Sequence, residues 1–171
     1  EEIRRAGPER MIFTSSAATI RAGAGKMATE ADSEPWPLTH WRHQYAAVKI
    51  AMEQEALRAA ADGLAVVIVN PSLCIGEYDA RAFSGRSVLA FAKYRPRWYT
   101  KASFNVVYTG DVGVGHVRAA KAGRVGERYL LAGQNVNLKE FGSLACRELG
   151  LPPPRWKIPP AAVTLAACGV E

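Results

Sequence analysis

Three side chains in the first third of the chain are suited to moving a proton at an alcohol or a ketone. Tyr45 and Lys49 are four residues apart, so on a helix their phenol and ammonium groups project from the same face. A neighbouring cation favours the phenolate form of a tyrosine, which can exchange a proton with a hydroxyl or carbonyl oxygen. Ser16 can hydrogen-bond the same oxygen. The structural alternatives are a surface helix pair for Tyr45 and Lys49 and a helix cap for Ser16.

Two apolar runs and one helix are expected to bring these residues together. Residues 11–14 and 63–70 are short apolar stretches of the kind that form strands buried on both faces. Between them, residues 42–62 are rich in alanine and predict a helix. A strand, a helix and a second strand form a crossover in which the two strands are parallel. Ser16 then follows the carboxyl end of the first strand, at the sheet edge where ligands bind.

The helix of residues 42–62 has a predicted buried face and a predicted exposed face. Apolar positions at helical spacing predict one buried stripe: Val48, Met52, Ala56 and Ala59. Charged positions of the same helix are predicted to face water: Glu53, Glu55 and Arg58. The helix is therefore expected to pack on the sheet through its apolar stripe.

The rest of the chain alternates between helices and strands. Predicted elements are a helix over 84–94, an extended stretch over 105–109, a helix beginning near an N-cap at Asp111, a strand over 128–132 and a helix over 139–149 closed by Gly150. A short strand and a helix are expected after the prolines at 152–154. The alternation predicts an α/β fold, with a partial Rossmann-like parallel sheet between helices and a smaller C-terminal α/β lobe. That lobe falls mainly within residues 71–104 and 133–171.

The composition excludes several classes of protein. The 171 residues are 49% hydrophobic and 22% charged, which is a globular balance, and no apolar run is long enough to cross a bilayer. The net charge of +6 permits anionic partners without requiring them, and no nucleic-acid partner is expected because the basic residues are scattered. Cys74, Cys146 and Cys168 are an odd number with wide spacing, so neither a disulfide framework nor a metal site is predicted. A reducing cytoplasm is the expected location.

Four blocks carry a resemblance to a known family: residues 11–19 (MIFTSSAAT), 45–55 (YAAVKIAMEQE), 63–76 (GLAVVIVNPSLCIG) and 106–141. In order and spacing they resemble the extended short-chain dehydrogenase/reductases, the NAD-dependent epimerase/dehydratase family. The last block, with GERYLLAGQN, is most similar to the branch called hopanoid-associated sugar epimerase. The resemblance covers nearly the whole chain and implies that residues 1–171 are the C-terminal, catalytic part of such a domain, with the smaller lobe as its substrate lobe.

The resemblance implies a role for each candidate residue. Tyr45 would be the general acid and base and would also contact the cofactor. Lys49 would bind the nicotinamide ribose and keep Tyr45 acidic, and Ser16 would bind the substrate and polarise its reacting C–O group. The nicotinamide pocket would be lined by the segment after the second strand: Pro71, Ser72 and Leu73. The implied cofactor is NAD or NADP, and the residue that distinguishes the two lies outside this sequence.

Three functions are compatible with these residues. The first is an NAD(P)-dependent oxidoreductase or epimerase acting on the hydroxyl of a sugar or a nucleotide sugar. The second is an NADPH-dependent ketone reductase of the dihydroflavonol-reductase type. The third, of another class, is a truncated, non-catalytic interaction domain. The first two imply a small-molecule substrate, and the pairing of long helices in this family makes a homodimer one option for the oligomeric state.

One part of the family pattern is missing from this sequence. The family places a glycine-rich turn, which approaches the cofactor pyrophosphate, in a first βα unit upstream of the residues present here. Gly23 to Ala28 match G-x-G-x-x-A, but Asp32, Pro35 and Pro37 follow, so no regular helix can begin there. The chain is therefore expected to be either a fragment of a longer enzyme or a short protein that cannot hold NAD(P) tightly.

A basic and aromatic cluster is the next candidate for ligand binding. Its members lie close together in the sequence: Lys93, Tyr94, Arg95, Arg97, Trp98, Tyr99 and Lys101. Such a mixture can hold a diphosphate and stack on a base, and a solvated loop is the structural alternative. By analogy with family members that act on sugar nucleotides, Arg97 is the predicted substrate-binding residue.

The histidines carry weaker predictions. His40 and His43 lie between Ser16 and the helix, where substrate specificity varies in this family, and residues 36–41 are a candidate lid. His116 is predicted to be packed or capped rather than catalytic.

Overall fold

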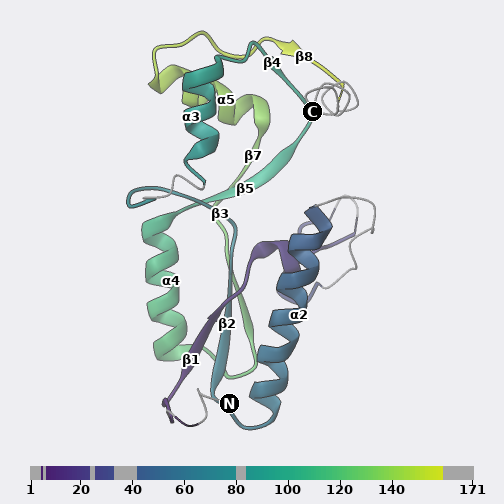
Figure 1. Cartoon of the computed structure of the whole chain (residues 1–171), viewed down its shortest axis with the longest axis vertical. Coiled ribbons are helices and arrows are strands. Elements are labelled where there is room, and N and C mark those ends of the chain that lie inside the picture. The colour runs from purple at the N-terminus through teal and green to yellow at the C-terminus, as the bar shows by residue number, and fades with distance from the viewer. Residues whose placement is uncertain (1–4, 6, 24–25, 33–41, 80–83, 160–171) are drawn as a thin grey trace. The chain divides into compact units, whose positions relative to one another are not determined.

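The computed structural model describes residues 5, 7–23, 26–32, 42–79 and 84–159 (Figure 1). The chain divides into two compact units. Unit 1 comprises residues 1–74 and 107–132, and unit 2 comprises residues 75–106 and 133–171. The role in substrate binding that the sequence predicts for the smaller lobe stays a prediction.

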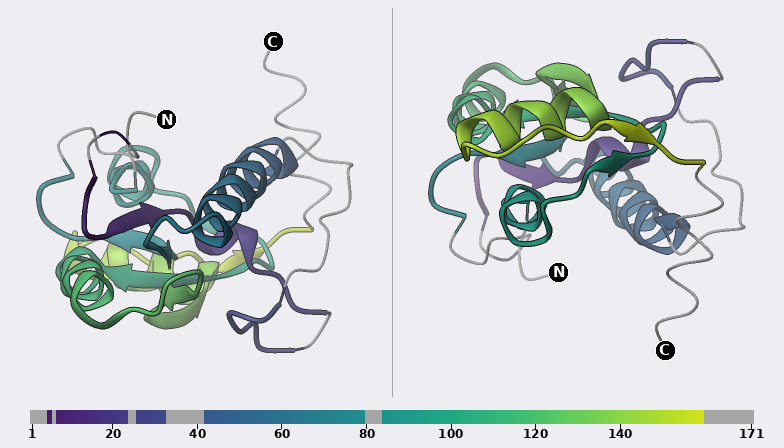
Figure 2. Two further views of the ribbon diagram at one scale, coloured as in Figure 1. Left: turned by 90° about the horizontal axis from the view of Figure 1, so that it is seen from below. Right: turned by 90° about the horizontal axis from the view of Figure 1, so that it is seen from above.

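Unit 1 is built on a parallel three-stranded sheet in the order β1 (Met11–Thr14), β2 (Val66–Pro71), β6 (Arg128–Leu131). Every residue of the central strand β2 is buried. Helix α2 (Arg42–Ala61) and helix α4 (Thr109–Ala122) lie on opposite sides of this sheet (Figures 1 and 2). The predicted α/β class, with a parallel sheet between helices, is therefore confirmed.

The two faces of β2 belong to two separate apolar cores, because successive side chains of a strand point to opposite faces. Val66 and Ile68 pack with Ala56 of α2. Val67 and Val69 pack with Ala119 of α4. A helix on each face explains why the sequence of this strand is a continuous apolar run rather than an alternating one.

The face of α2 that packs on the sheet agrees only in part with the predicted one. Ala56 and Ala59 pack against the core as predicted. Val48 and Met52, predicted to be buried, are exposed, whereas Glu53, predicted to face water, is only 3% exposed. The apolar stripe misleads here because alanines on all sides allow several faces to pack, and Glu53 has polar partners that make its burial favourable.

Unit 2 contains most of a second sheet, in the order β3 (Leu73–Ile75), β5 (Ser103–Tyr108), β7 (Gln134–Asn137). Strands β5 and β7 are antiparallel. Helices α3 (Arg86–Tyr94) and α5 (Leu138–Glu148) pack together around Phe91 and Phe141. Strands β4 (Trp98–Tyr99) and β8 (Trp156–Lys157) form a separate parallel pair.

Several predicted boundaries and connections need correction. Helix α4 begins at Thr109 with Tyr108 as its N-cap, so Asp111 lies in the first turn and is not the cap. A carboxylate in the first turn is still favourable, because it faces the positive end of the helix dipole. Strands β3, β4 and β7 are not among the predicted elements. The helix expected after the last strand lies outside the described residues.

In the part of the chain that the structure describes, no helix is long and apolar enough to cross a membrane. The same residues contain no group of three or more histidine, cysteine or acidic side chains placed to hold a metal ion.

Candidate functional site

Ser16 follows β1 and begins a short 3-10 helix, η1 (Ala17–Thr19). Its side chain is half-buried, and its Oγ accepts a hydrogen bond from the backbone N–H of Ala18 at 3.2 Å. Ser16 is therefore the N-cap of η1, which is the structural role considered for it in the sequence. A hydroxyl that accepts through its oxygen keeps an O–H that can be donated to a ligand.

Helix α2 brings Lys49 to the same end of β1. The Nζ of Lys49 donates a hydrogen bond to the backbone oxygen of Thr14 at 3.4 Å. Thr14 is the last residue of β1 and stands two positions before Ser16. Tyr45 lies one turn before Lys49 on α2, and its side chain is half exposed, at 52%. The ammonium group and the serine are thus both at the carboxyl end of β1.

The carboxyl end of β2 lies beside these residues. Ser15 donates its backbone N–H to the oxygen of Val69 at 2.8 Å, and the Nδ2 of Asn70 donates to the backbone oxygen of Ser16 at 3.2 Å. Pro71 is buried at the end of β2, and Ser72 donates its N–H to Leu131 of β6 at 3.1 Å. Leu73, half-buried, begins β3. Pro71 and Ser72 therefore lie at the same edge of the sheet as Ser16.

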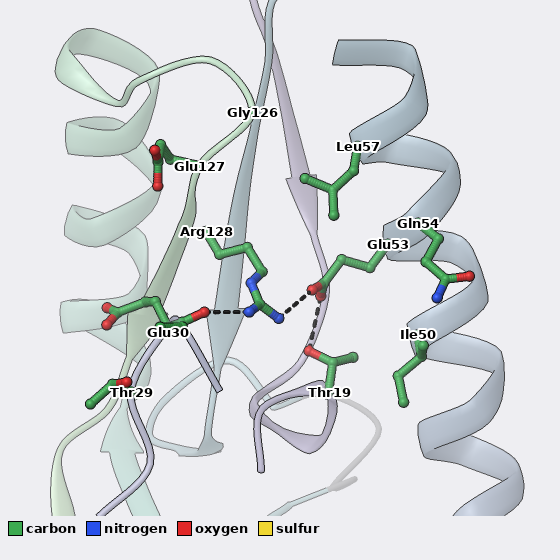
Figure 3. A pocket seen from close by; sticks show the side chains of 11 residues that line it. Thr19, Thr29, Glu30, Ile50, Glu53, Gln54, Leu57, Gly126, Glu127 and Arg128 are labelled. Carbon is green, nitrogen blue, oxygen red and sulfur yellow. Dashed lines mark hydrogen bonds and ion pairs between the residues drawn. The ribbon is translucent and has the colours of Figure 1, made fainter. Parts of the chain in front are cut away.

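A buried carboxylate that the sequence analysis placed in water connects these elements. Glu53 lies one turn after Lys49 on α2. Its Oε2 accepts hydrogen bonds from Thr19 Oγ1 at 2.9 Å and from Asn70 Nδ2 at 2.8 Å. Its Oε1 is 3.2 Å from a guanidinium nitrogen of Arg128 (Figure 3). The carboxylate therefore links α2 to η1, to the end of β2 and to β6.

The signal that could have revealed Glu53 is its spacing. Tyr45, Lys49 and Glu53 are four residues apart in turn, so they lie along one side of α2. Because Glu53 is on the same side of α2 as Lys49, a Lys49 side chain that points to the sheet implies that Glu53 points to the sheet as well. A buried glutamate needs partners, and Thr19, Asn70 and Arg128 come from three distant parts of the sequence.

A pocket of about 820 Å³ opens beside this network (Figure 3). It is lined by α2, by the segment of residues 29–31 and by the start of β6. Arg128 donates to the backbone oxygen of Glu30, and the Glu30 side chain accepts from the backbone N–H of Leu130 at 3.1 Å. The segment before α2 is thus fastened to the edge of β6. Neither Ser16, Tyr45 nor Lys49 lines this pocket.

Asp32 fixes the turn of that segment. Its carboxylate accepts from the backbone N–H of Thr29 at 2.7 Å and from the Thr29 hydroxyl at 3.0 Å. These hydrogen bonds, the backbone one first, lower the pKa of the Asp32 carboxyl group. The Asp32 carboxylate therefore stays charged, and keeps its hydrogen bonds in the turn, to a lower pH than an isolated aspartate would.

The comparison with known families decides the classification. The sequence model of the NAD dependent epimerase/dehydratase family matches residues 1–132. The chain belongs to this family. The resemblance drawn from the four sequence blocks is therefore confirmed, whereas the hopanoid-associated branch stays a prediction.

Two curated relatives of this epimerase/dehydratase chain differ in their described activities. A putative dihydroflavonol 4-reductase from Synechocystis is 35% identical over 161 residues, covering 91% of this chain and 46% of the relative. Sterol demethylase protein B from Methylococcus capsulatus is 32% identical over 163 residues, covering 94% of this chain and 48% of the relative. The chain thus spans about half the length of the curated relatives it matches.

Solved structures of epimerases and dehydratases share the fold. A nucleoside-diphosphate-sugar epimerase from Pseudomonas aeruginosa is 29% identical, with a TM-score of 0.85 over 97% of this chain and 55% of that chain. A UDP-glucose 4-epimerase from Thermus thermophilus, solved with NAD, has a TM-score of 0.71 at 23% identity, covering 92% of this chain and 53% of that chain. The second likeness concerns the fold alone.

Gly115 allows close packing in this epimerase/dehydratase chain. Gly110, Gly113 and Gly115 lie inside α4, and a Cβ at Gly115 would stand 2.7 Å from the Leu131 side chain. Gly23 is described, but residues 24 and 25 of the G-x-G-x-x-A match are not. Among the described residues, β1 leads into η1 rather than into a glycine-rich turn and a long helix.

His116 has the structural role predicted for it. Its Nδ1 lies 2.8 Å from the backbone oxygen of Val112, and its Nε2 lies 2.9 Å from Thr14 Oγ1. Because a carbonyl oxygen can only accept, Nδ1 carries a proton and donates to Val112. His40, residues 36–41 and the His43 side chain lie outside what the structure describes.

Arg97 belongs to unit 2, and the other candidate residues belong to unit 1. Its guanidinium group lies 5.9 Å from the centre of the Trp156 ring. Its Nε is buried and has no hydrogen-bond partner among the described residues. The assignment of Arg97 to substrate binding stays a prediction.

Cys74 gives a test of the environment just after Ser72 and Leu73. Burial raises the pKa of the Cys74 thiol, and its Sγ donates to the backbone oxygen of Ser72 at 3.4 Å. The thiolate is the reactive form, so we expect iodoacetamide to modify Cys74 more slowly in the folded chain than in the unfolded chain. The ratio of the unfolded-chain rate to the folded-chain rate should fall as the pH rises through the pKa of Cys74 in the folded chain. Peptide mass spectrometry measures both rates.

The pH dependence separates this cause from restricted access. A raised folded pKa means that the thiol stabilises the fold below its unfolded pKa, and that this contribution is lost at higher pH. If restricted access alone slowed the reaction, the rate ratio would stay constant with pH. A constant ratio would therefore contradict a raised pKa of the Cys74 thiol.

Proposed function

We propose that unit 1 provides the catalytic face of an NAD(P)-dependent oxidoreductase or epimerase that acts on the hydroxyl of a sugar or a nucleotide sugar. The observation that carries the proposal is the contact of Lys49 with the end of β1, two residues from Ser16. Tyr45, one turn away on the same helix, has an accessible phenol. A phenol, a cation and a hydroxyl at one sheet edge suit proton transfer at an alcohol.

Each residue has a defined role in this proposal. Tyr45, as the phenolate, takes the proton from the substrate hydroxyl and returns it in the reverse direction. Lys49 would hold the ribose hydroxyls and stabilises the phenolate form of Tyr45 that accepts this proton. Ser16 donates its O–H to the reacting oxygen, and the backbone of residues 71–73 would line the nicotinamide pocket. When bound, NAD(P) accepts or returns the hydride.

The donor set fits one end of the cofactor. An ammonium group, a hydroxyl and a strand end at the same edge suit the ribose and the ring of a nicotinamide nucleotide. Among the described residues nothing corresponds to the glycine-rich turn that approaches a pyrophosphate. The fit therefore extends to the nicotinamide half of NAD or NADP.

A second function is favoured by a different observation. The Synechocystis relative at 35% identity is a putative dihydroflavonol 4-reductase, which supports an NADPH-dependent ketone reductase. The Pseudomonas structure at 29% identity supports an epimerase that acts on a nucleoside-diphosphate sugar. A homodimer and a cytoplasmic location remain proposals. The alternative of another class is a non-catalytic interaction domain.

Binding of nicotinamide mononucleotide tests the proposal directly, because this ligand carries only the half of the cofactor that these residues fit. We expect the chain to bind it, and the Lys49→Met variant to bind about tenfold more weakly, since a hydrogen bond from a charged group is lost. Calorimetric titration measures both affinities. Lys121→Met, on the exposed side of α4, is the matched control and should bind as the unaltered chain does.

The outcomes distinguish the three functions. Failure of the chain to bind the mononucleotide, NAD or NADP would favour the non-catalytic domain and contradict the first proposal. With a sugar nucleotide present, transient reduction of bound NAD without net turnover identifies an epimerase. Net consumption of NADPH with a ketone identifies a reductase.

A further inference from the structure

Thr14, the last residue of β1, contacts helices on both faces of the unit 1 sheet. Its backbone oxygen accepts the hydrogen bond from Lys49 Nζ of α2, at 3.4 Å. Its hydroxyl oxygen lies 2.9 Å from Nε2 of His116, which belongs to α4. Because α2 and α4 lie on opposite sides of the sheet (Figures 1 and 2), Thr14 connects Lys49 to the helix on the far side.

Helix α4 is attached to both ends of β1. Just before the strand begins, Arg10 Nη1 donates to the backbone oxygens of Ala120, at 3.1 Å, and Gly123, at 2.9 Å, where α4 ends. At the other end of the strand, Thr14 meets His116. Among the described strands only β2 pairs with β1, so the sheet holds β1 from one side. The two contacts with α4 therefore add a restraint at each end of the strand.

The sheet leaves the carbonyl group of Thr14 to Lys49. Ser15 donates its backbone N–H to Val69 of β2 at 2.8 Å. Successive residues of a strand direct their backbone groups to alternate sides, so the N–H and C=O groups of Thr14 point away from β2. The Thr14 oxygen is the atom that Lys49 Nζ contacts. A displacement of Thr14 therefore changes where the ammonium group is held.

The contact with His116 restrains Thr14 through short, stiff side chains. Threonine is branched at Cβ and has one restricted side-chain torsion, so holding its hydroxyl also holds its backbone. The imidazole ring is itself held, because Nδ1 donates to the backbone oxygen of Val112 at 2.8 Å. Helix α4 lies close to the sheet at the neighbouring Gly115, where a Cβ would stand 2.7 Å from the Leu131 side chain. The ring therefore has little freedom to move away from Thr14.

Both charge states of His116 preserve this contact. In the neutral ring with its proton on Nδ1, Nε2 accepts a hydrogen bond from the Thr14 hydroxyl. In the charged ring, Nε2 carries a proton as well and donates it to the Thr14 hydroxyl oxygen. A hydroxyl can take either part because it has one donor and two lone pairs. The restraint on Thr14 is thus present in both states.

We propose that His116 is a positioning residue, which holds Thr14 so that the Thr14 backbone oxygen stays in place for the Lys49 ammonium group. His116 acts through Thr14 and touches neither substrate nor cofactor in this role. Its effect on cofactor binding rests on the function proposed above for Lys49. Its effect on the Lys49 side chain does not, and it can be measured without any ligand.

Two variants of His116 separate the two hydrogen bonds of the ring. The amide of a glutamine extends from the backbone about as far as Nε2, whereas the amide of an asparagine extends about as far as Nδ1. His116→Gln should therefore keep the contact with Thr14, and His116→Asn should keep the contact with Val112 and lose Thr14. Thr14→Val removes the hydroxyl and keeps the backbone, so it should reproduce the effect of His116→Asn. Thermal unfolding followed by circular dichroism verifies that the variants fold.

The rate at which acetic anhydride modifies Lys49 in the 171-residue chain reports how its ammonium group is held. The neutral amine is the form that reacts, and a hydrogen bond to a carbonyl oxygen favours the charged form. We expect Lys49 to react about threefold faster in His116→Asn and in Thr14→Val, which is the effect of one modest hydrogen bond. In His116→Gln it should react as in the unaltered chain. Peptide mass spectrometry measures the rates, with the exposed Lys101 of unit 2 as internal reference.

Three results would overturn the positioning role. The first is an equal rate at Lys49 in the asparagine and glutamine variants of His116. The second is an unchanged rate in Thr14→Val. The third is an equal rise at Lys121, an exposed lysine of α4, because this would indicate a general loosening of unit 1.

Binding of nicotinamide mononucleotide distinguishes this proposal from the function on which its consequence rests. We expect His116→Asn to bind the mononucleotide about threefold more weakly and His116→Gln to bind it as the unaltered chain does. If the unaltered chain fails to bind while the acetylation rates follow the expected pattern, the proposed function is contradicted and the positioning role stands. If the chain binds and the two His116 variants show equal affinity and equal acetylation, the positioning role fails alone.

Discussion

Replacing Tyr45 with phenylalanine should lower the turnover number by about a hundredfold to ten-thousandfold, the range that a positioned general acid or base contributes. The change removes one oxygen from a half-exposed side chain, so the fold and the contact of Lys49 with β1 stay in place. Cofactor affinity should therefore change little, while turnover falls. Steady-state kinetics, together with a cofactor titration, measures the two quantities.

A matched control separates proton transfer from a general effect of losing a hydroxyl. Tyr94→Phe makes the same chemical change at an exposed tyrosine of unit 2 and should leave the turnover number unaltered. Equal turnover of Tyr45→Phe and the unaltered protein would remove Tyr45 from the mechanism. A parallel loss of cofactor affinity would assign it to binding instead.

Much of unit 1 could be predicted from the sequence because local signals agree with the final packing. The run around Val66 to Val69 is apolar at every position, and it is buried at every position because helices cover both faces of β2. The positions of Ser16 and Lys49 at one strand end follow from the same crossover. Strand β3 is too short to give a periodic signal, so it was not predicted.

The orientation of α2 could not be predicted from hydrophobicity. Val48 and Met52 are exposed, although both are large apolar residues. The smaller Ala56 is buried against β2, and Leu57 packs beside it. The position of Glu53 is set by partners in η1, β2 and β6 that no local pattern reveals. Burial of a carboxylate is a tertiary property, because it depends on donors brought together only by the fold.

Removal of the Glu53 side chain should be the most damaging single change to the stability of unit 1. In Glu53→Ala, the guanidinium group of Arg128 and the donors of Thr19 and Asn70 lose a buried acceptor. Breaking a buried ion pair by deleting one partner costs about 3–5 kcal/mol, because the other charge is left uncompensated. Denaturant unfolding followed by circular dichroism measures this loss in the free energy of unfolding.

The neighbouring glutamate on the same helix provides the control. Glu55 pairs with Arg58, but both side chains are largely exposed. Glu55→Ala should therefore change the free energy of unfolding by no more than about 0.5 kcal/mol. Similar losses for the two alanine variants would mean that helix propensity, rather than the buried network, controls the stability at Glu53.

A double-mutant cycle isolates the contribution of the ion pair itself. If Glu53 and Arg128 stabilise each other, the double variant Glu53→Ala with Arg128→Ala should lose clearly less than the sum of the two single losses. Additive losses would show that the two side chains act independently. Asn70 donates both to Glu53 and to the backbone oxygen of Ser16. Removal of the Glu53 side chain should therefore also loosen the turn that holds the Ser16 hydroxyl. Glu53, which the sequence pattern predicts to face water, is thus expected to stabilise the fold and to position the candidate site.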